Sequence, residues 1–138
     1  MAYDPSNVFA KILRGEIPCT KVYEDAETLA FMDIMPICDG HVLVVPKTPA
    51  RNVLDATPAQ LAACMQTVQR VSKAVMAAFD AGGVSIRQAN EAAGGQEVFH
   101  LHFHVLPRHD GVKLKPHTGR IEKPDILAAN AERIRKAL

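Results

Sequence analysis

Hydrophobic and polar residues alternate strictly between residues 100 and 105, in a segment that reads His-Leu-His-Phe-His-Val-Leu over residues 100–106. Successive side chains of a β-strand point to opposite faces of a sheet, so the alternation predicts a strand. His100, His102 and His104 would then share one face, and the apolar residues between them would be buried on the other. A helix would not separate these residues in this way, because its period is about 3.6 residues.

Four further segments have the composition of β-strands. They are rich in β-branched and aromatic residues, and turn-forming residues separate them. The predicted strands comprise residues 20–24, 28–34, 41–46 and 84–90, with a hairpin turn at residues 25–27.

One long amphipathic helix is predicted between the third and fourth of these strands. Thr57 is a suitable N-cap and Pro58 a suitable first helical residue. Gly82 and Gly83 are expected to end the helix. Its apolar stripe comprises Leu61, Met65, Val68, Val71, Val75 and Phe79. With shorter helices predicted at residues 7–14 and 124–136, the pattern indicates one antiparallel α+β domain over residues 1–138.

The charge is small overall but unevenly placed. The net charge is +1, which does not indicate a nonspecific nucleic-acid partner. Residues 108–138 carry eight Lys or Arg against four Asp or Glu, whereas the remaining residues carry eight against eleven. This basic segment either helps an anionic ligand to approach or forms a solvated surface. No apolar run approaches the ~20 residues that a membrane helix needs, so no membrane partner is expected.

The three cysteines are Cys19, Cys38 and Cys64, and no two of them form a Cys-x-x-Cys pair. An odd number without such a pair argues against a disulfide framework. It favours a reducing, cytoplasmic location.

Three explanations compete for the row of histidines. Structural histidines would each need a hydrogen-bonding partner when buried. Two of them could bind a metal ion with a further ligand, for which His41, His109 and His117 are available. Alternatively, a neutral imidazole could attack phosphorus while the Gly94-Gly95 loop presents backbone N–H groups to a phosphate. Only covalent catalysis uses both the histidine row and the glycine loop.

Several segments together resemble the histidine triad (HIT) superfamily, and in particular its Hint-like nucleotide-binding branch. The resemblance covers about residues 5–110 and leaves residues 111–138 as a basic C-terminal extension. The matching segments are residues 14–18, 29–34, 40–47, 90–91 and 95–106.

The resemblance implies a HIT-like fold with a five-stranded antiparallel sheet, one long helix and short terminal helices. Two protomers would join their sheets in a homodimer. It also implies a purine nucleotide-binding hydrolase that cleaves nucleoside phosphoramidates or related AMP or GMP conjugates at the α-phosphorus, through a nucleotidyl-histidine intermediate. Two alternatives are a regulatory nucleotide-binding protein with little or no catalysis and a dinucleoside polyphosphate hydrolase.

Matching positions give each histidine an expected role. His102 would be the nucleophile, and His104 would contact the phosphate or the leaving group. His100 and His41 would complete a hydrogen-bonded chain that holds His102 in the required tautomer.

The nucleotide-binding residues are also expected from matching positions. Asp33 would hold the ribose hydroxyls. The apolar base pocket would comprise Phe9, Ile12, Phe31 and Ile34. The loop on the phosphate side would contribute Asn90, Gly95, Gln96, Glu97 and Val98.

Two departures from the family pattern carry expectations of their own. Asn7 and Ala10 stand where many relatives have a Cys-x-x-Cys that helps to hold zinc, so no metal and no cofactor is expected. Glu97 stands where Hint proteins usually have Ser or Thr. A carboxylate near an anionic phosphate costs electrostatic energy, so Glu97 is expected to affect the rate and the leaving-group preference.

Overall fold

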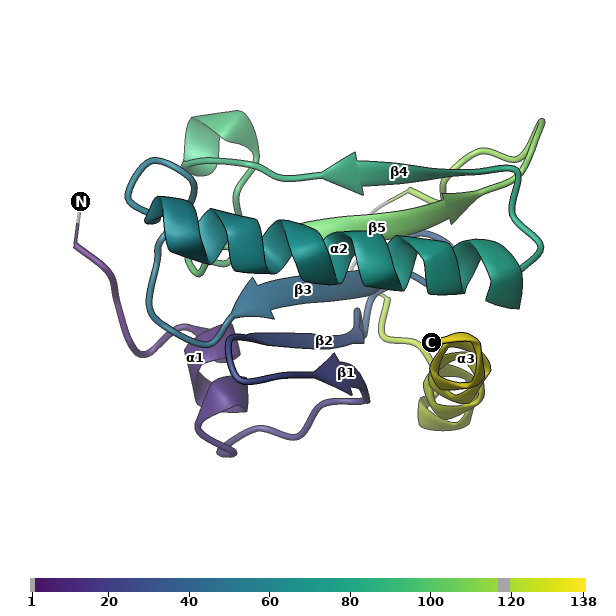
Figure 1. Ribbon diagram of the computed structural model, residues 1–138, viewed down its shortest axis with the longest axis horizontal. Helices are drawn as coiled ribbons and strands as arrows, with labels where there is room; N and C mark the ends of the chain where they lie inside the picture. Colours follow the sequence, from purple (N-terminus) through teal and green to yellow (C-terminus); the bar gives the residue numbers. More distant parts are fainter. Residues whose placement is uncertain (1, 117–119) are drawn as a thin grey trace.

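The computed structural model describes residues 2–116 and 120–138. Its elements are α1 (Val8–Leu13), β1 (Lys21–Glu24), β2 (Thr28–Met32), β3 (Val42–Pro46), α2 (Pro58–Ala78), β4 (Gly83–Arg87), the 3-10 turn η1 (Ala92–Gly94), β5 (Phe103–Arg108) and α3 (Pro124–Ala137). The strands form one antiparallel sheet in the order β1-β2-β3-β5-β4 (Figure 1). This confirms the predicted α+β class and the five-stranded sheet.

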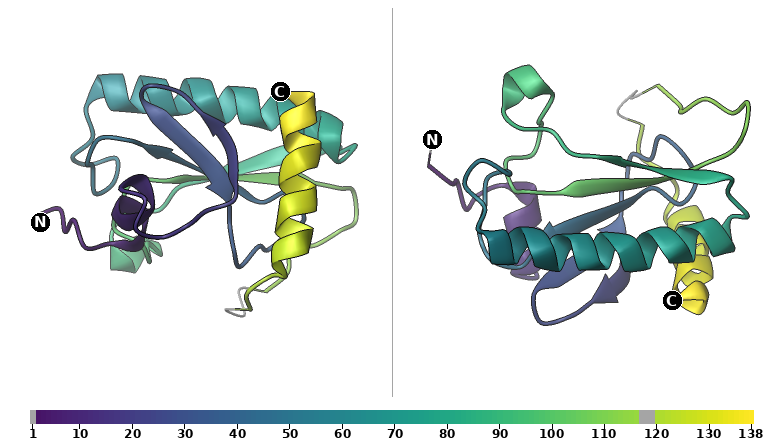
Figure 2. Two further views of the ribbon diagram at one scale, coloured as in Figure 1. Left: turned by 90° about the horizontal axis from the view of Figure 1, so that it is seen from below. Right: turned by 45° about the horizontal axis from the view of Figure 1, so that its top comes forward.

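The two faces of the sheet have different coverings. Helix α2 lies along one face, and the short helix α1 lies on the other (Figure 2). In β2, Ala30 and Met32 join the core that contains α2, whereas Leu29 and Phe31 join a smaller cluster with residues of α1. The period of two residues therefore produces two apolar layers, and the smaller one leaves part of its face open for a site.

The start of α2 agrees with the prediction, but its buried stripe differs by one residue. Thr57 and Gln60 form a reciprocal capping box at the N-terminus. Cys64 is fully buried under the sheet, whereas the predicted core residue Met65 is 46% exposed. The correction follows from helix geometry, because neighbouring positions are about 100° apart and only one of them can face the core.

Helix α2 also ends earlier than predicted, at Ala78 rather than at Gly82 and Gly83. Asp80 adopts a positive φ of 48°, which stops the helical path without a glycine. The ring of Phe79 packs against Gly40, where a Cβ atom would lie 2.6 Å from the ring. Gly40 also has a φ of +85°, so both its backbone and its contact with Phe79 favour glycine.

The histidine strand begins later than predicted. β5 starts at Phe103, so His100 and His102 precede it. The pairing of β5 with β3 ends at Phe103 and Val44, two residues before β3 itself ends at Pro46. The N–H of Leu101 instead donates to the carbonyl of Ala50, 2.8 Å away. Burial nevertheless alternates from Leu101 to Val105, whereas His100 and Leu106 are both buried.

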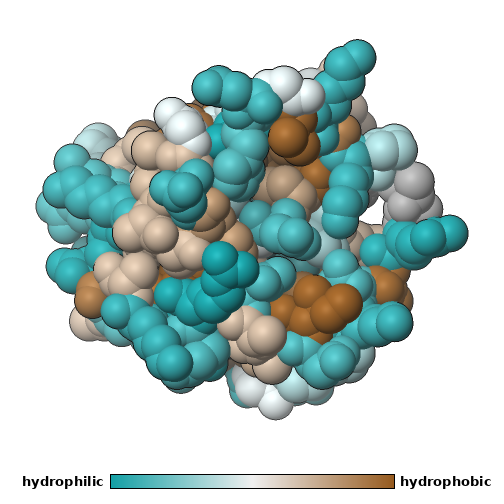
Figure 3. All heavy atoms as spheres, turned by 90° about the vertical axis from the view of Figure 1, so that its right-hand side faces the viewer, coloured by the Kyte–Doolittle hydropathy of each residue, from teal (hydrophilic) through white to brown (hydrophobic). Residues whose placement is uncertain are grey.

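The C-terminal extension contributes to the core. Leu127, Ala131 and Ile134 of α3 are buried in the cluster that contains α2. Seen from the side of the molecule where α3 lies, the surface is mostly hydrophilic with separated hydrophobic patches (Figure 3). α3 is therefore an amphipathic helix packed on the domain, not a wholly solvated segment.

The cysteines are free, as predicted. Within the described part of the chain, no helix combines the length and the apolar character required to cross a membrane.

Replacing Ile134 by Ala should lower the free energy of unfolding by about 2–5 kcal/mol, because it leaves a cavity in the core. Ile126, on the same helix and 37% exposed, provides the matched control. Ile126→Ala should cost less than about 1 kcal/mol. Urea unfolding followed by circular dichroism measures both values. Equal small losses would show that α3 is not packed on the core in solution.

Candidate active site

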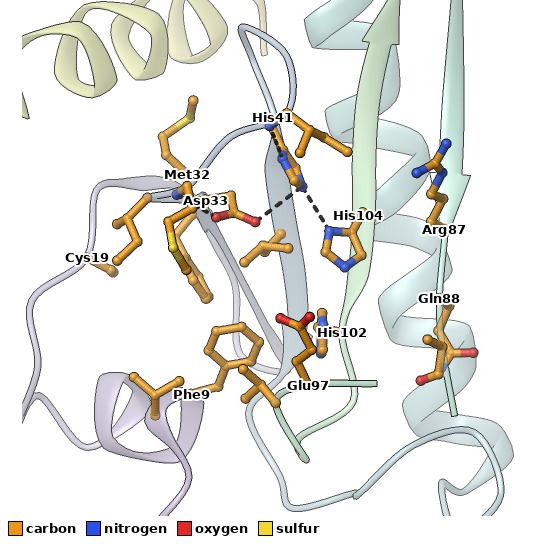
Figure 4. Close-up of a pocket in the computed structure, with 18 of the residues that line it drawn as sticks. Phe9, Cys19, Met32, Asp33, His41, Arg87, Gln88, Glu97, His102 and His104 are labelled. Carbon is orange, nitrogen blue, oxygen red and sulfur yellow. Dashed lines mark hydrogen bonds and ion pairs between the residues drawn. The ribbon is translucent and has the colours of Figure 1, made fainter. Parts of the chain in front are cut away.

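A cavity of about 960 Å³ opens on the face of the sheet that α2 does not cover. Figure 4 shows side chains from α1, β2, β4 and β5 around it. Residues expected to form the site that line this cavity are Phe9, Ile12, Phe31, Asp33, Ile34, His41, Gly95, Glu97, Val98, His102 and His104. The fold therefore brings together residues that are up to 95 positions apart in the sequence.

The orientation of His102 is fixed by the main chain next to it. Its Nδ1 atom lies 2.7 Å from the carbonyl oxygen of His100. A carbonyl can only accept, so Nδ1 carries the hydrogen and Nε2 is unprotonated in the neutral ring. The ring of Phe9 packs edge-on against that of His102, with centroids 4.9 Å apart. Burial lowers the pKa of His102 below 6.5, which keeps the ring neutral at neutral pH.

His41 and His104 form a second fixed pair. The N–H of Ile37 donates to Nδ1 of His41, 3.2 Å away, so the hydrogen of a neutral His41 ring is on Nε2. That Nε2 lies 2.8 Å from Nδ1 of His104 and can donate to it. His104 follows His102 by two residues, and their ring centroids are 5.0 Å apart. The hydrogen bonds that link Ile37, His41 and His104 therefore end beside His102 (Figure 4).

His100 does not belong to this open row, which corrects the expectation that the three histidine rings share one face of a strand. Its side chain is buried, it does not line the cavity, and its Nε2 lies 2.9 Å from the carbonyl oxygen of Pro46. The hydroxyl of Tyr3 lies 2.6 Å from its Nδ1. Burial lowers the pKa of His100. The carbonyl group of His100 therefore accepts the hydrogen bond from His102. The ring of His100 is hydrogen-bonded to Tyr3 and Pro46, which are distant in the sequence.

Asp33 lies at the end of β2 beside this histidine pair. One carboxylate oxygen accepts from the N–H of Met35 at 2.8 Å, and the other lies 3.4 Å from Nε2 of His41. These contacts hold the carboxylate at the wall of the cavity.

Within the described residues, Asp33, His41 and His104 form the group that could hold a metal ion, since their ligand atoms lie within 4.8 Å of one another. In this structure Nε2 of His41 is hydrogen-bonded to Nδ1 of His104 and lies 3.4 Å from the Asp33 carboxylate. His109 is elsewhere, with Nε2 2.9 Å from the carbonyl oxygen of Phe79, and His117 lies outside the described residues. The expected absence of a metal stays a prediction.

Asn7, at one of the two positions where the family pattern would place cysteine, has a structural role in this chain. Asn7 is the N-cap of α1 and accepts from the N–H of Ala10 at 2.9 Å. Asn7 therefore positions the helix that carries Phe9 into the cavity.

The apolar residues line the end of the cavity next to α1. Phe9 and Phe31 pack edge to face with centroids 5.4 Å apart. Ile12 lines the same region, and Ile34 is 48% exposed at its rim. An apolar slot of this kind can bury a planar base.

The loop before the histidines divides into lining and supporting residues. Gly95, Glu97 and Val98 line the cavity, and Gly95 has a φ of +96°. Asn90 and Gln96 do not line it.

Hydrogen bonds give these two residues supporting contacts. The side-chain oxygen of Asn90 accepts from the N–H of Val53 at 3.0 Å. Gln96 is buried, accepts from the N–H of Glu91 at 2.7 Å and donates to the carbonyl of Val98 at 3.0 Å. Both side chains therefore stabilise the loop through its backbone without lining the cavity. Their direct contact with a nucleotide stays a prediction.

Several lining residues were not expected from the sequence. Arg87 and Gln88 come from the end of β4, and Leu114 and Lys115 come from the C-terminal extension. Arg87 pairs with His104 in the register of β4 and β5, so the alternation along β4 could have placed it on the histidine face. No comparable pattern marks Lys115, because only the path of the folded extension brings it to the cavity.

Comparisons with known proteins agree with this architecture. The family model described as HIT domain matches residues 14–111. Adenosine 5'-monophosphoramidase hnt1 of Schizosaccharomyces pombe is 37% identical over 75% of this chain and 74% of its own. Adenylylsulfatase HINT3 of Arabidopsis thaliana is 39% identical over 73% of this chain, which spans about half of that longer protein.

A solved structure extends the similarity to the whole chain. The Hit-like protein of Bartonella henselae, described as involved in cell-cycle regulation, has a TM-score of 0.93 and 50% sequence identity. The match covers 99% of this chain and all of that one, so it includes the extension with α3. The family model spans the sheet, α2 and the histidine segment, and the chain therefore belongs to the HIT family.

Proposed function

We propose that this HIT-family hydrolase cleaves purine nucleoside phosphoramidates or related AMP and GMP conjugates at the α-phosphorus. The observation that carries the proposal is the fixed tautomer of His102, whose Nδ1 is bonded to the carbonyl of His100. Its Nε2 is the free nitrogen of a neutral ring in a cavity large enough for a nucleotide.

The reaction has two steps at His102. Nε2 attacks the α-phosphorus, a P–N bond to the enzyme forms, and the bond to the leaving group breaks. Water then hydrolyses the nucleotidyl-histidine, releases the mononucleotide and restores the ring. His104, 5.0 Å from His102 between ring centroids, contacts the phosphate or leaving group, and His41 holds its tautomer.

The nucleoside would extend from His102 toward α1. The base would lie among Phe9, Ile12, Phe31 and Ile34, and the ribose hydroxyls would reach Asp33. Two relatives support the reaction class through their names, since one is a monophosphoramidase and the other an adenylylsulfatase. No cofactor enters this scheme.

The homodimer is part of the same proposal. β4 is an edge strand of the sheet. An edge strand offers unpaired backbone groups to a second strand, so two copies could join their sheets there. The cytoplasmic location inferred from the cysteines also stays a prediction.

A regulatory nucleotide-binding role is the second candidate, and Glu97 is the observation that favours it. Glu97 lies beside His102 in the cavity (Figure 4). A carboxyl group there opposes an incoming phosphate, which favours slow turnover with binding retained. Micromolar AMP binding without turnover of any AMP conjugate would support this role over catalysis.

Replacing His102 by Ala should lower kcat for an adenosine phosphoramidate by at least about a thousandfold, because the nucleophile is lost. AMP binding measured by calorimetry should remain. His109→Ala is the matched control, since His109 lies outside the cavity. Mass spectrometry of wild-type protein quenched during turnover should locate the nucleotidyl adduct on His102. Undiminished turnover by His102→Ala would exclude the proposed nucleophile.

The pH dependence follows from the lowered pKa of His102. Only the unprotonated ring attacks, and burial moves its protonation below pH 6.5. Therefore kcat/KM should change little between pH 8 and about pH 6.5, then fall as the pH drops further. NMR titration of the His102 ring carbon protons should give the same midpoint as the acidic limb. A midpoint above pH 6.5 would contradict the assignment.

A further inference from the structure

The cavity has two ends that differ in chemistry, with the histidines between them. The end next to α1 is apolar and includes Phe9 and Ile12. At the other end, Arg87 of β4 lies beyond His104 (Figure 4), and Lys115 of the C-terminal extension also lines the cavity. Burial raises the pKa of the Cys38 thiol, and the charges of both side chains oppose that rise, so they lie in the same region. Its volume of about 960 Å³ is near the upper limit of ligand sites, roughly 300–1,000 Å³. Room therefore remains beyond the histidines for a second group on the α-phosphorus.

Arg87 is placed at this end by the register of the sheet. It is the cross-strand partner of His104 in the antiparallel pair of β4 and β5. Directly paired residues have side chains on the same face about 5 Å apart at Cβ, within reach of a long side chain. In Figure 4 Arg87 lies beyond His104 as seen from Phe9, on the opposite side from Asp33.

Lys115 reaches the same cavity from outside the region matched by the family model. Its backbone N–H donates to the carbonyl of Ile37 at 2.8 Å. The N–H of Ile37 in turn donates to Nδ1 of His41. Through its two backbone hydrogen bonds, Ile37 thus connects the backbone of Lys115 to the hydrogen-bonded pair of His41 and His104.

Among the described residues, neither Arg87 nor Lys115 forms an ion pair with an acidic side chain, whereas some other basic side chains of the domain do. Lys47 pairs with Glu24 at 2.7 Å, and Arg51 pairs with Glu91 at 2.7 Å. Two positive charges that line a cavity without such a partner favour an anion there.

From this placement we infer that Arg87 and Lys115 form a leaving-group subsite that selects an oxyanion, such as a phosphate chain or sulfate. The inference rests on the proposed function. When His102 Nε2 bonds to phosphorus, the P–O bond breaks and its electron pair stays on the leaving oxygen. Such a group needs its growing negative charge neutralised, whereas an amine leaving group must also gain a proton. The subsite therefore determines specificity among AMP conjugates.

The test compares two substrates of one enzyme, adenosine 5'-phosphosulfate with a sulfate leaving group and adenosine 5'-phosphoramidate with an ammonia leaving group. In Arg87→Gln and Lys115→Gln, the ratio of kcat/KM for the phosphosulfate to that for the phosphoramidate should fall about tenfold each. Lys113→Gln, in the same extension but outside this cavity, is the control and should leave the ratio within about twofold.

A second measurement needs no variant. For the wild-type protein, kcat/KM for the phosphosulfate should fall more steeply with ionic strength than for the phosphoramidate, since salt screens exposed charges. An unchanged ratio in both variants, or an equal salt dependence, would overturn the subsite while leaving the hydrolase intact. If the wild type cleaved neither the phosphosulfate nor the phosphoramidate, that result would instead overturn the proposed function.

Discussion

The hydrogen bond from Nδ1 of His102 to the carbonyl of His100 fixes the chemistry of the cavity, because it decides which ring nitrogen is free. It lies just before the start of β5 at Phe103, where the preceding residues are outside the ladder. His100 is itself held through its ring, by the carbonyl of Pro46 and the hydroxyl of Tyr3. Three segments far apart in the sequence thus hold one nitrogen in place. Such rigid support suits the nucleophile that we propose, because the reacting atom must be held in a defined geometry.

The buried face of the same segment explains why this support is stable. Leu101, Phe103 and Val105 are buried in the core that contains α2, while His102 and His104 point to the opposite side. Any slip in register by one residue would expose the apolar side chains and bury the polar ones. Packing on one face therefore sets the positions of His102 and His104 on the other. The same alternation of apolar residues and histidines thus contributes to the core and positions the histidines in the cavity.

This alternation is what made much of the site predictable from the sequence. Local periods and caps predicted all five strands, the long helix, the two shorter helices and the placement of His102 and His104. They could not predict the burial of His100, because its partners Tyr3 and Pro46 are distant in the sequence. The supporting role of Gln96 likewise depends on contacts across the loop. Tertiary contacts decided these cases, and sequence periodicity does not encode them.

The role of the C-terminal extension also depends on tertiary contacts that its sequence does not reveal. Its charge alone left open whether it attracts an anion or is only solvated. Its fold separates these roles, since Ile134 is buried in the core while Lys115 lines the cavity. The carbonyl of Ile37 accepts from Lys115, and the N–H of the same residue orients His41. If the proposed subsite is correct, chain variation outside the region matched by the family model would change the preferred leaving group without altering the histidines.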